Sequence, residues 1–95
     1  SFTYKEEKMK LEEVKLRKGK IAKKGDEVRI INHPFVSYSI AGKSGAIEGI
    51  ERVKIHHPGC VDDRGEGWDE DYIAVKISLP LGSMSIDSFY LEKVD

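Results

Sequence analysis

Apolar residues recur at every second position in two long stretches of the chain, a period that is typical of β-strands with one buried face. Residues 72–79 show the pattern most clearly, because three β-branched residues in this stretch would share one face. Residues 46–55 alternate in a similar way, and Gly49 within them is a natural bend or bulge position. We therefore predict a strand over 72–79 and a long, bent strand over 46–55.

Shorter β-prone segments flank these two strands. We predict short strands over residues 14–16 and 27–31, one that begins at Met84, and a last one over 91–94. Asp87 is placed to cap a single helical turn before the last strand. The close spacing of the strands predicts an all-β fold, a small five-stranded SH3-like barrel over residues 14–95, because closing a sheet covers edges that a small domain would otherwise expose.

Two segments differ from the rest in composition. Residues 1–13 are mostly polar and show no clear apolar stripe, which predicts a flexible or edge-packed N-terminal arm. Residues 56–70 contain Pro58, three glycines and a cluster of acids, which predicts a long acidic loop of the kind that is usually functional or mobile.

Overall composition narrows the class of protein. The chain has 95 residues, of which 39% are apolar and 35% charged, and it contains a single cysteine. These values exclude a multi-domain enzyme, a disulfide-stapled mini-protein and a membrane-spanning segment. A lone cysteine favours a soluble protein of a reducing compartment, such as the cytoplasm or an organelle stroma.

The net charge of −1 conceals two oppositely charged regions. Residues 1–29 contain ten Lys or Arg and six Asp or Glu, whereas residues 56–71 contain six acids and only Arg64. Six of the cations occur with no acid between Val14 and Gly25: Lys15, Arg17, Lys18, Lys20, Lys23 and Lys24. Because local potential guides partners, the basic run and the acidic loop are two candidate docking features.

Four segments resemble a known family. Residues 25–30, 42–47, 72–77 and 90–92 resemble the SH3-like accessory proteins of electron transport. That group includes the small E-type accessory protein of photosystem I, the variable chain of ferredoxin–thioredoxin reductase and the C-terminal barrel of the nitrile hydratase β subunit. The likeness to the nitrile hydratase barrel is the most detailed and covers about residues 25–94.

The family's helical part and its metal-claw cysteine cluster have no counterpart among these residues. The resemblance therefore implies a non-catalytic subunit, without a cofactor of its own, that docks onto a larger redox or metal enzyme. A barrel subunit of a nitrile-hydratase-like heteromer is a further alternative. The basic run supports another, a KOW-like nucleic-acid or ribosome-associated module, although the near-neutral charge does not favour it.

The acidic loop contains the side chains best suited to bind a metal or to react. His56, His57, Cys60, Asp62 and Asp63 offer ligand types for a transition metal, but no second cysteine or histidine pair completes a closed site. A polar loop with an incidental thiol is therefore the preferred interpretation, and a reactive Cys60 beside two histidines is the alternative.

No catalytic motif is present, and we predict that the protein is not an enzyme. Trp68 is a candidate interface anchor, because tryptophan is enriched among binding hot spots. The predicted partner-binding residues are Lys15, Arg17, Lys18, Lys20, Lys23, Lys24, Cys60, Asp62, Asp63, Arg64 and Trp68.

Overall fold

The computed structural model describes residues 4–59 and 67–95 and shows an all-β protein, as predicted. The strands are β1 (Lys5–Lys10), β2 (Glu13–Lys15), β3 (Ile21–Lys23), β4 (Glu27–Ile30), β5 (Ser44–His57), β6 (Trp68–Leu79), β7 (Gly82–Asp87) and β8 (Leu91–Lys93). Two short 3-10 helices, η1 (Arg17–Gly19) and η3 (Ser88–Tyr90), join some of them.

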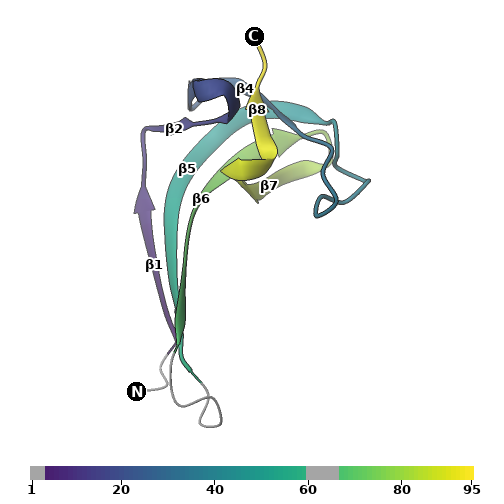
Figure 1. Cartoon of the computed structure of the whole chain (residues 1–95). Helices are drawn as coiled ribbons and strands as arrows, with labels where there is room; N and C mark the ends of the chain where they lie inside the picture. The colour runs from purple at the N-terminus through teal and green to yellow at the C-terminus, as the bar shows by residue number, and fades with distance from the viewer. Residues whose placement is uncertain (1–3, 60–66) are drawn as a thin grey trace.

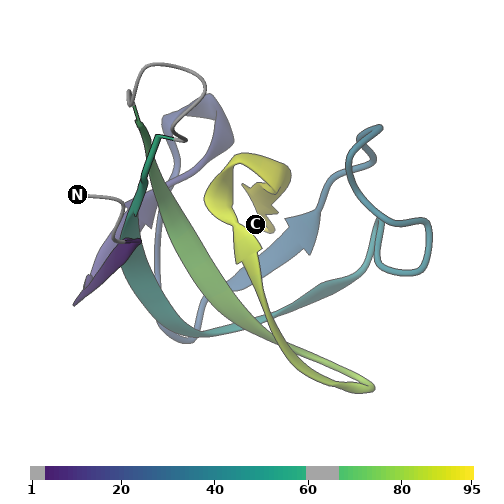
Figure 2. The same cartoon turned by 90° about the horizontal axis from the view of Figure 1, so that it is seen from below.

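The main sheet is antiparallel, with the strand order β7-β6-β5-β4-β8 and with β1 added to β5 (Figure 1). Strands β2 and β3 form a separate two-stranded hairpin. The last strand, β8, therefore returns to lie beside β4. No sheet closes on itself among the described residues. Seen from below, the strands nevertheless curve around a common centre (Figure 2).

The long strand β5 changes partners along its length. Its start pairs with β4 and its end pairs with β1, while β6 follows it on the other side. The β5–β6 register shifts between Ile47 and Gly49, which confirms the bend predicted at this glycine. This long hairpin divides the molecule into two regions.

The first region, which we call the body, holds the hydrophobic core. Alternate residues of β4, β5 and β6 point inward, and the β2–β3 hairpin adds further side chains to the same cluster. The buried members are Val14, Leu16, Ala22, Val28, Ile30, Ile47, Ile50, Val75, Ile77 and Leu91. Asp87 caps η3 as predicted, its Oδ1 accepting from the Phe89 amide at 2.9 Å.

The second region, which we call the extension, consists of residues 5–10, 51–57 and 68–73. These segments form a three-stranded sheet that projects from the body and lengthens the molecule to 48 Å, against 29 and 27 Å in the other directions (Figure 1). Every residue of β1 is exposed, and Val53 is the buried residue of this sheet.

The extension bears on two sequence predictions. Residues 5–10, predicted to lie in a flexible or edge-packed arm, pair with β5 as an edge strand, because the main-chain groups of a strand offer partners whatever the side chains are. The acidic loop is also shorter than predicted. His56 and His57 end β5, and Trp68 to Asp71 begin β6 as their cross-strand partners.

Candidate docking surface

The two faces of the extension carry different chemistry. Side chains alternate between the faces of a strand, and directly paired residues of antiparallel strands share a face. Arg52 and Ile73 are paired and follow the core pair Ile50 and Val75 by two residues, so their face continues the interior of the body. We call this the inner face, and the opposite one the outer face.

The outer face carries an aromatic cluster. The rings of His57 and Trp68 are stacked with centroids 3.8 Å apart and an interplanar angle of 13°. Tyr4 meets His57 edge-on, with centroids 5.8 Å apart. Trp68 remains 58% exposed and Tyr4 53% exposed, so the cluster is half open to solvent. We call Tyr4, His57 and Trp68 the aromatic cluster.

Carboxylates hold this cluster in place. His57 Nε2 lies 2.5 Å from Glu70 Oε1, and the Tyr4 hydroxyl donates to Glu6 Oε2 at 3.1 Å. The hydrogen bond to Glu6 raises the pKa of Tyr4, because ionisation would remove the donated proton and place a phenolate beside a carboxylate. One carboxylate from each edge strand of the extension therefore contacts the cluster, Glu6 of β1 at Tyr4 and Glu70 of β6 at His57.

The inner face is charged. Arg52 binds Asp71 through two hydrogen bonds, from Nε to Oδ1 at 3.0 Å and from Nη2 to Oδ2 at 2.7 Å. His56 Nδ1 lies 2.6 Å from Asp69 Oδ1. The Arg52 hydrogen bonds, together with the positive charges of Arg52 and Lys54, lower the pKa of Asp71. The same contact raises the pKa of Arg52.

The alternation of side chains along β5 argues against the metal site that the sequence analysis considered. His56 and His57 are neighbours on one strand and lie on opposite faces, so they cannot both bind one ion. Cys60, Asp62, Asp63 and Arg64 lie outside the described residues. Within residues 4–59 and 67–95, no group of three or more His, Cys, Asp or Glu is placed to hold a metal.

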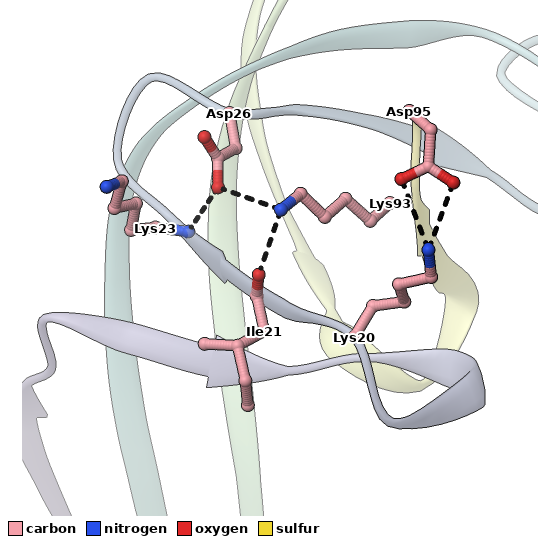
Figure 3. A network of polar contacts seen from close by, with 6 residues as sticks. All are labelled: Lys20, Ile21, Lys23, Asp26, Lys93 and Asp95. Atoms are coloured by element: carbon pink, nitrogen blue, oxygen red, sulfur yellow. Dashed lines mark hydrogen bonds and ion pairs between the residues drawn. The ribbon is translucent and has the colours of Figure 1, made fainter.

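The predicted basic run lies on the β2–η1–β3 hairpin of the body, and two of its cations are engaged there. Arg17 donates from Nε to the Phe89 carbonyl at 3.2 Å, and its guanidinium carbon lies 4.9 Å from the Phe89 ring centroid. Lys20 Nζ binds Asp95 at 3.1 Å (Figure 3). These contacts fasten the hairpin to the C-terminal part of the chain.

A second set of contacts strengthens that attachment. Lys93 Nζ donates to the Ile21 carbonyl at 3.2 Å and lies 3.7 Å from Asp26, which accepts from the Lys23 amide (Figure 3). The four remaining cations have no side-chain partner among the described residues: Lys15, Lys18, Lys23 and Lys24. The basic run is thus partly a structural feature and partly a free surface.

The structure separates the predicted docking residues. The basic hairpin and the start of β6, whose first residue is Trp68, lie at opposite ends of the molecule (Figure 1). Tyr4 and the Arg52–Asp71 pair were not singled out from the sequence. One sequence feature could have indicated this hairpin. The two histidines before Pro58 and the acids after Trp68 are complementary side chains, as expected of cross-strand partners.

Comparisons with protein-family models, with curated proteins and with solved structures found no match to this chain. In the described parts of the chain, no helix is long and apolar enough to span a membrane. A functional proposal therefore has to rest on the surface of the molecule. The extension is the part of that surface with the least covering by other segments among the described residues.

Proposed function

We propose that this chain is a non-catalytic accessory subunit that docks onto a larger protein complex, and that its body is an SH3-like barrel. The strand order, in which β8 returns to β4 after the short helix η3, supports the barrel. The extension supports the docking role and is the observation that carries the proposal.

The extension is a single-layer sheet in which Val53 is buried and the other side chains are exposed or half-buried, so it covers little apolar surface. Sheets in stable domains bury at least one face against a second layer. The extension has no such layer among the described residues, yet its aromatic cluster is built into a fixed arrangement. Exposed tryptophan and tyrosine held in place are typical of interface hot spots. A partner protein would supply the missing layer over the outer face.

The test is the size of the protein in its natural source. We expect the chain, tagged at its own locus, to elute with a complex much larger than 10.7 kDa. Trp68→Ala and Tyr4→Ala should release it as a monomer while circular dichroism stays unchanged. Tyr38→Ala is the matched control, because this residue is 96% exposed on a loop of the body.

Two results would contradict this proposal. A wild-type protein that always elutes alone would exclude the accessory role. Release by Tyr38→Ala but not by Trp68→Ala would place docking on the body loops rather than on the extension.

The type of complex is proposed from the sequence resemblance alone. SH3-like accessory proteins of electron transport serve redox enzymes, and the related nitrile hydratase barrel serves a metal enzyme. We expect the co-purified complex to contain a metal or a redox cofactor, detectable by elemental analysis and absorption spectroscopy. A complex with neither would remove this part of the proposal and leave the docking role intact.

A second candidate function is nucleic-acid binding by the β2–η1–β3 hairpin. It is favoured by the four lysines of that hairpin whose side chains have no partner among the described residues. A titration with single-stranded RNA at about 50 and about 200 mM salt separates the candidates, because phosphate contacts weaken steeply with salt. Nucleic-acid binding predicts saturable binding at the lower salt that weakens steeply at the higher salt, whereas the docking role alone predicts no saturable binding at either.

A further inference from the structure

The strand β6 has a free edge along the extension. Residues 68–77 pair with β5 on one side, but on the other side β7 reaches only Ala74, which pairs with Asp87. After Asp87 the chain turns into η3 and leaves the sheet. Among the described residues, no strand pairs with this side of residues 68–73. Such an edge is a ready template for another strand.

The opposite edge of the extension is protected by its charges. β1 carries three lysines and two glutamates, and lysine on an edge strand discourages pairing with another chain. The charged residues of the β6 edge are all acids, at Asp69, Glu70 and Asp71. Pairing with the same edge of a second copy would place like charges opposite one another. The β6 edge is therefore complementary to a basic strand and not to itself.

A hollow lies next to this edge, on the inner face. Its volume is about 670 Å³, and Ile73, Asp87, Phe89 and Tyr90 are among the residues that line it. Phe89 is partly exposed there, in the short helix that directly follows β7. A strand added to β6 in line with β7 would direct its first inner side chain beside Ile73, at this hollow.

We propose that the free edge of β6 binds an extended basic segment of the partner protein, antiparallel to β6 and in line with β7. This inference rests on the proposed docking function and specifies its partner. Continuing the pairing beyond Ala74 and Asp87 places the first two positions of the segment opposite Ile73 and Tyr72. These two positions should be apolar.

The next three positions should be basic. They fall opposite Asp71, Glu70 and Asp69, and the sixth falls opposite Trp68 and should be apolar. Each carboxylate already has a partner on β5, at Arg52, His57 or His56. A carboxylate has about four acceptor sites, so it can receive a second donor from the added strand.

The probe is a fluorescein-labelled peptide of sequence Ile-Val-Arg-Lys-Arg-Val with blocked ends, titrated with the full chain at low salt. We expect saturable anisotropy and amide shift changes at residues 68–73. Asp69→Asn with Glu70→Gln should weaken binding by about two- to fivefold per carboxylate removed. Glu7→Gln with Glu12→Gln removes the same charge at exposed positions away from the β6 edge and should leave the affinity unchanged.

N-methylation of the peptide tests the strand geometry directly. Alternate amides of an added strand face β6 and the others face solvent. Methyl groups on the facing set should abolish binding, whereas methyl groups on the other set should not change it. Equal effects of the two sets would overturn strand addition, and shift changes at residues 5–10 in place of 68–73 would overturn the choice of edge.

Other outcomes separate this inference from the docking role. If Trp68→Ala releases the chain from its complex but the peptide does not bind, the partner is not a basic strand and the docking role stands. If the peptide binds but the chain elutes alone, the edge specificity stands and the accessory role fails. Concentration-dependent dimers that the peptide dissociates would make a second copy the occupant and overturn the proposal.

Discussion

The body and the extension are built from the same two long strands, yet the strands bury apolar side chains in the body and expose polar ones in the extension. In the body, β5 and β6 place alternate apolar residues in a core that also receives β4, β8 and the β2–β3 hairpin. In the extension, β1 is the further strand that pairs with β5 among the described residues, and polar groups lie on the inner face. The body has a second layer of chain to cover it, and the extension has none among the described residues.

The interactions that hold the two regions differ accordingly. Burial stabilises the body, where the largest side chains of the core are essentially inaccessible to solvent. The extension relies on cross-strand pairs between side chains, such as the Arg52–Asp71 ion pair and the His57–Trp68 stack. Each pair of this kind contributes about 0.2–1 kcal/mol, so the extension should open more readily than the body.

Ile47 and Ile55 give the largest expected contrast, since they are the same residue type on the same strand. Ile47 is 2% exposed in the core, whereas Ile55 is half-buried in the extension. We expect Ile47→Ala to lower the free energy of unfolding by about 2–5 kcal/mol, because it leaves a cavity. Ile55→Ala should cost less than about 1 kcal/mol. Urea denaturation measures both, and equal losses would show that the extension shares the core's cooperativity.

Two glycines of β5 differ in how closely the neighbouring backbone approaches them. A Cβ added at Gly45 would clash with the Ser78 carbonyl oxygen, a backbone atom that cannot move aside. Gly45→Ala should therefore destabilise the body by about 1–3 kcal/mol. Gly49 has no atom within 4 Å of such a Cβ, so Gly49→Ala is the matched control. Thermal unfolding compares them, and a similar Tm for both variants would contradict the close approach of β5 and β6.

The body was more predictable from the sequence than the extension. Alternation over 72–79 and 46–55 identified its two long strands, because an apolar core imposes a period of two on the sequence. The capping by Asp87 and the bend at Gly49 also followed from local chemistry. These features depend on residues close together in the chain.

The extension was not predicted as a sheet, because its charged side chains leave little alternation of apolar and polar residues in the sequence. β1 reads Lys-Glu-Glu-Lys-Met-Lys, which shows no apolar face, and its pairing with β5 joins residues more than forty positions apart. The segment around Trp68 has the proline, glycine and acid content of a loop, although its start and end form strands. Pairing across a sheet is decided by long-range contacts, which composition does not report.

The stack of His57 on Trp68 is expected to have a smaller effect than either change in the body. A double-mutant cycle with His57→Ala and Trp68→Ala should give a coupling of about 0.5–1 kcal/mol, the range for aromatic and cross-strand pairs. Leu81 is 96% exposed in the β6–β7 turn, so Leu81→Ala with Trp68→Ala should be additive. Additivity of the first pair would show that the stack does not stabilise the extension.

The smallest expected effect is the acid sensitivity of the extension. The Arg52 contact lowers the folded-state pKa of Asp71 below its unfolded value, so the stabilisation is fully present above the unfolded pKa and is lost as pH falls through the folded one. Opening of the extension should therefore increase below about pH 4, followed by the amide signals of residues 68–73.

Charge removal in the extension and in the body separates this effect from general acid unfolding. Arg52→Gln should return the pKa of Asp71, measured from its carboxyl carbon shift, toward the ordinary value and weaken the acid dependence of the extension. Arg29 lies 3.2 Å from Glu92 in the body, so Arg29→Gln removes an equal charge at a distant ion pair. That variant should leave the Asp71 titration unchanged. If both variants shift it equally, the overall charge of the protein, rather than the Arg52 contact, holds Asp71 ionised.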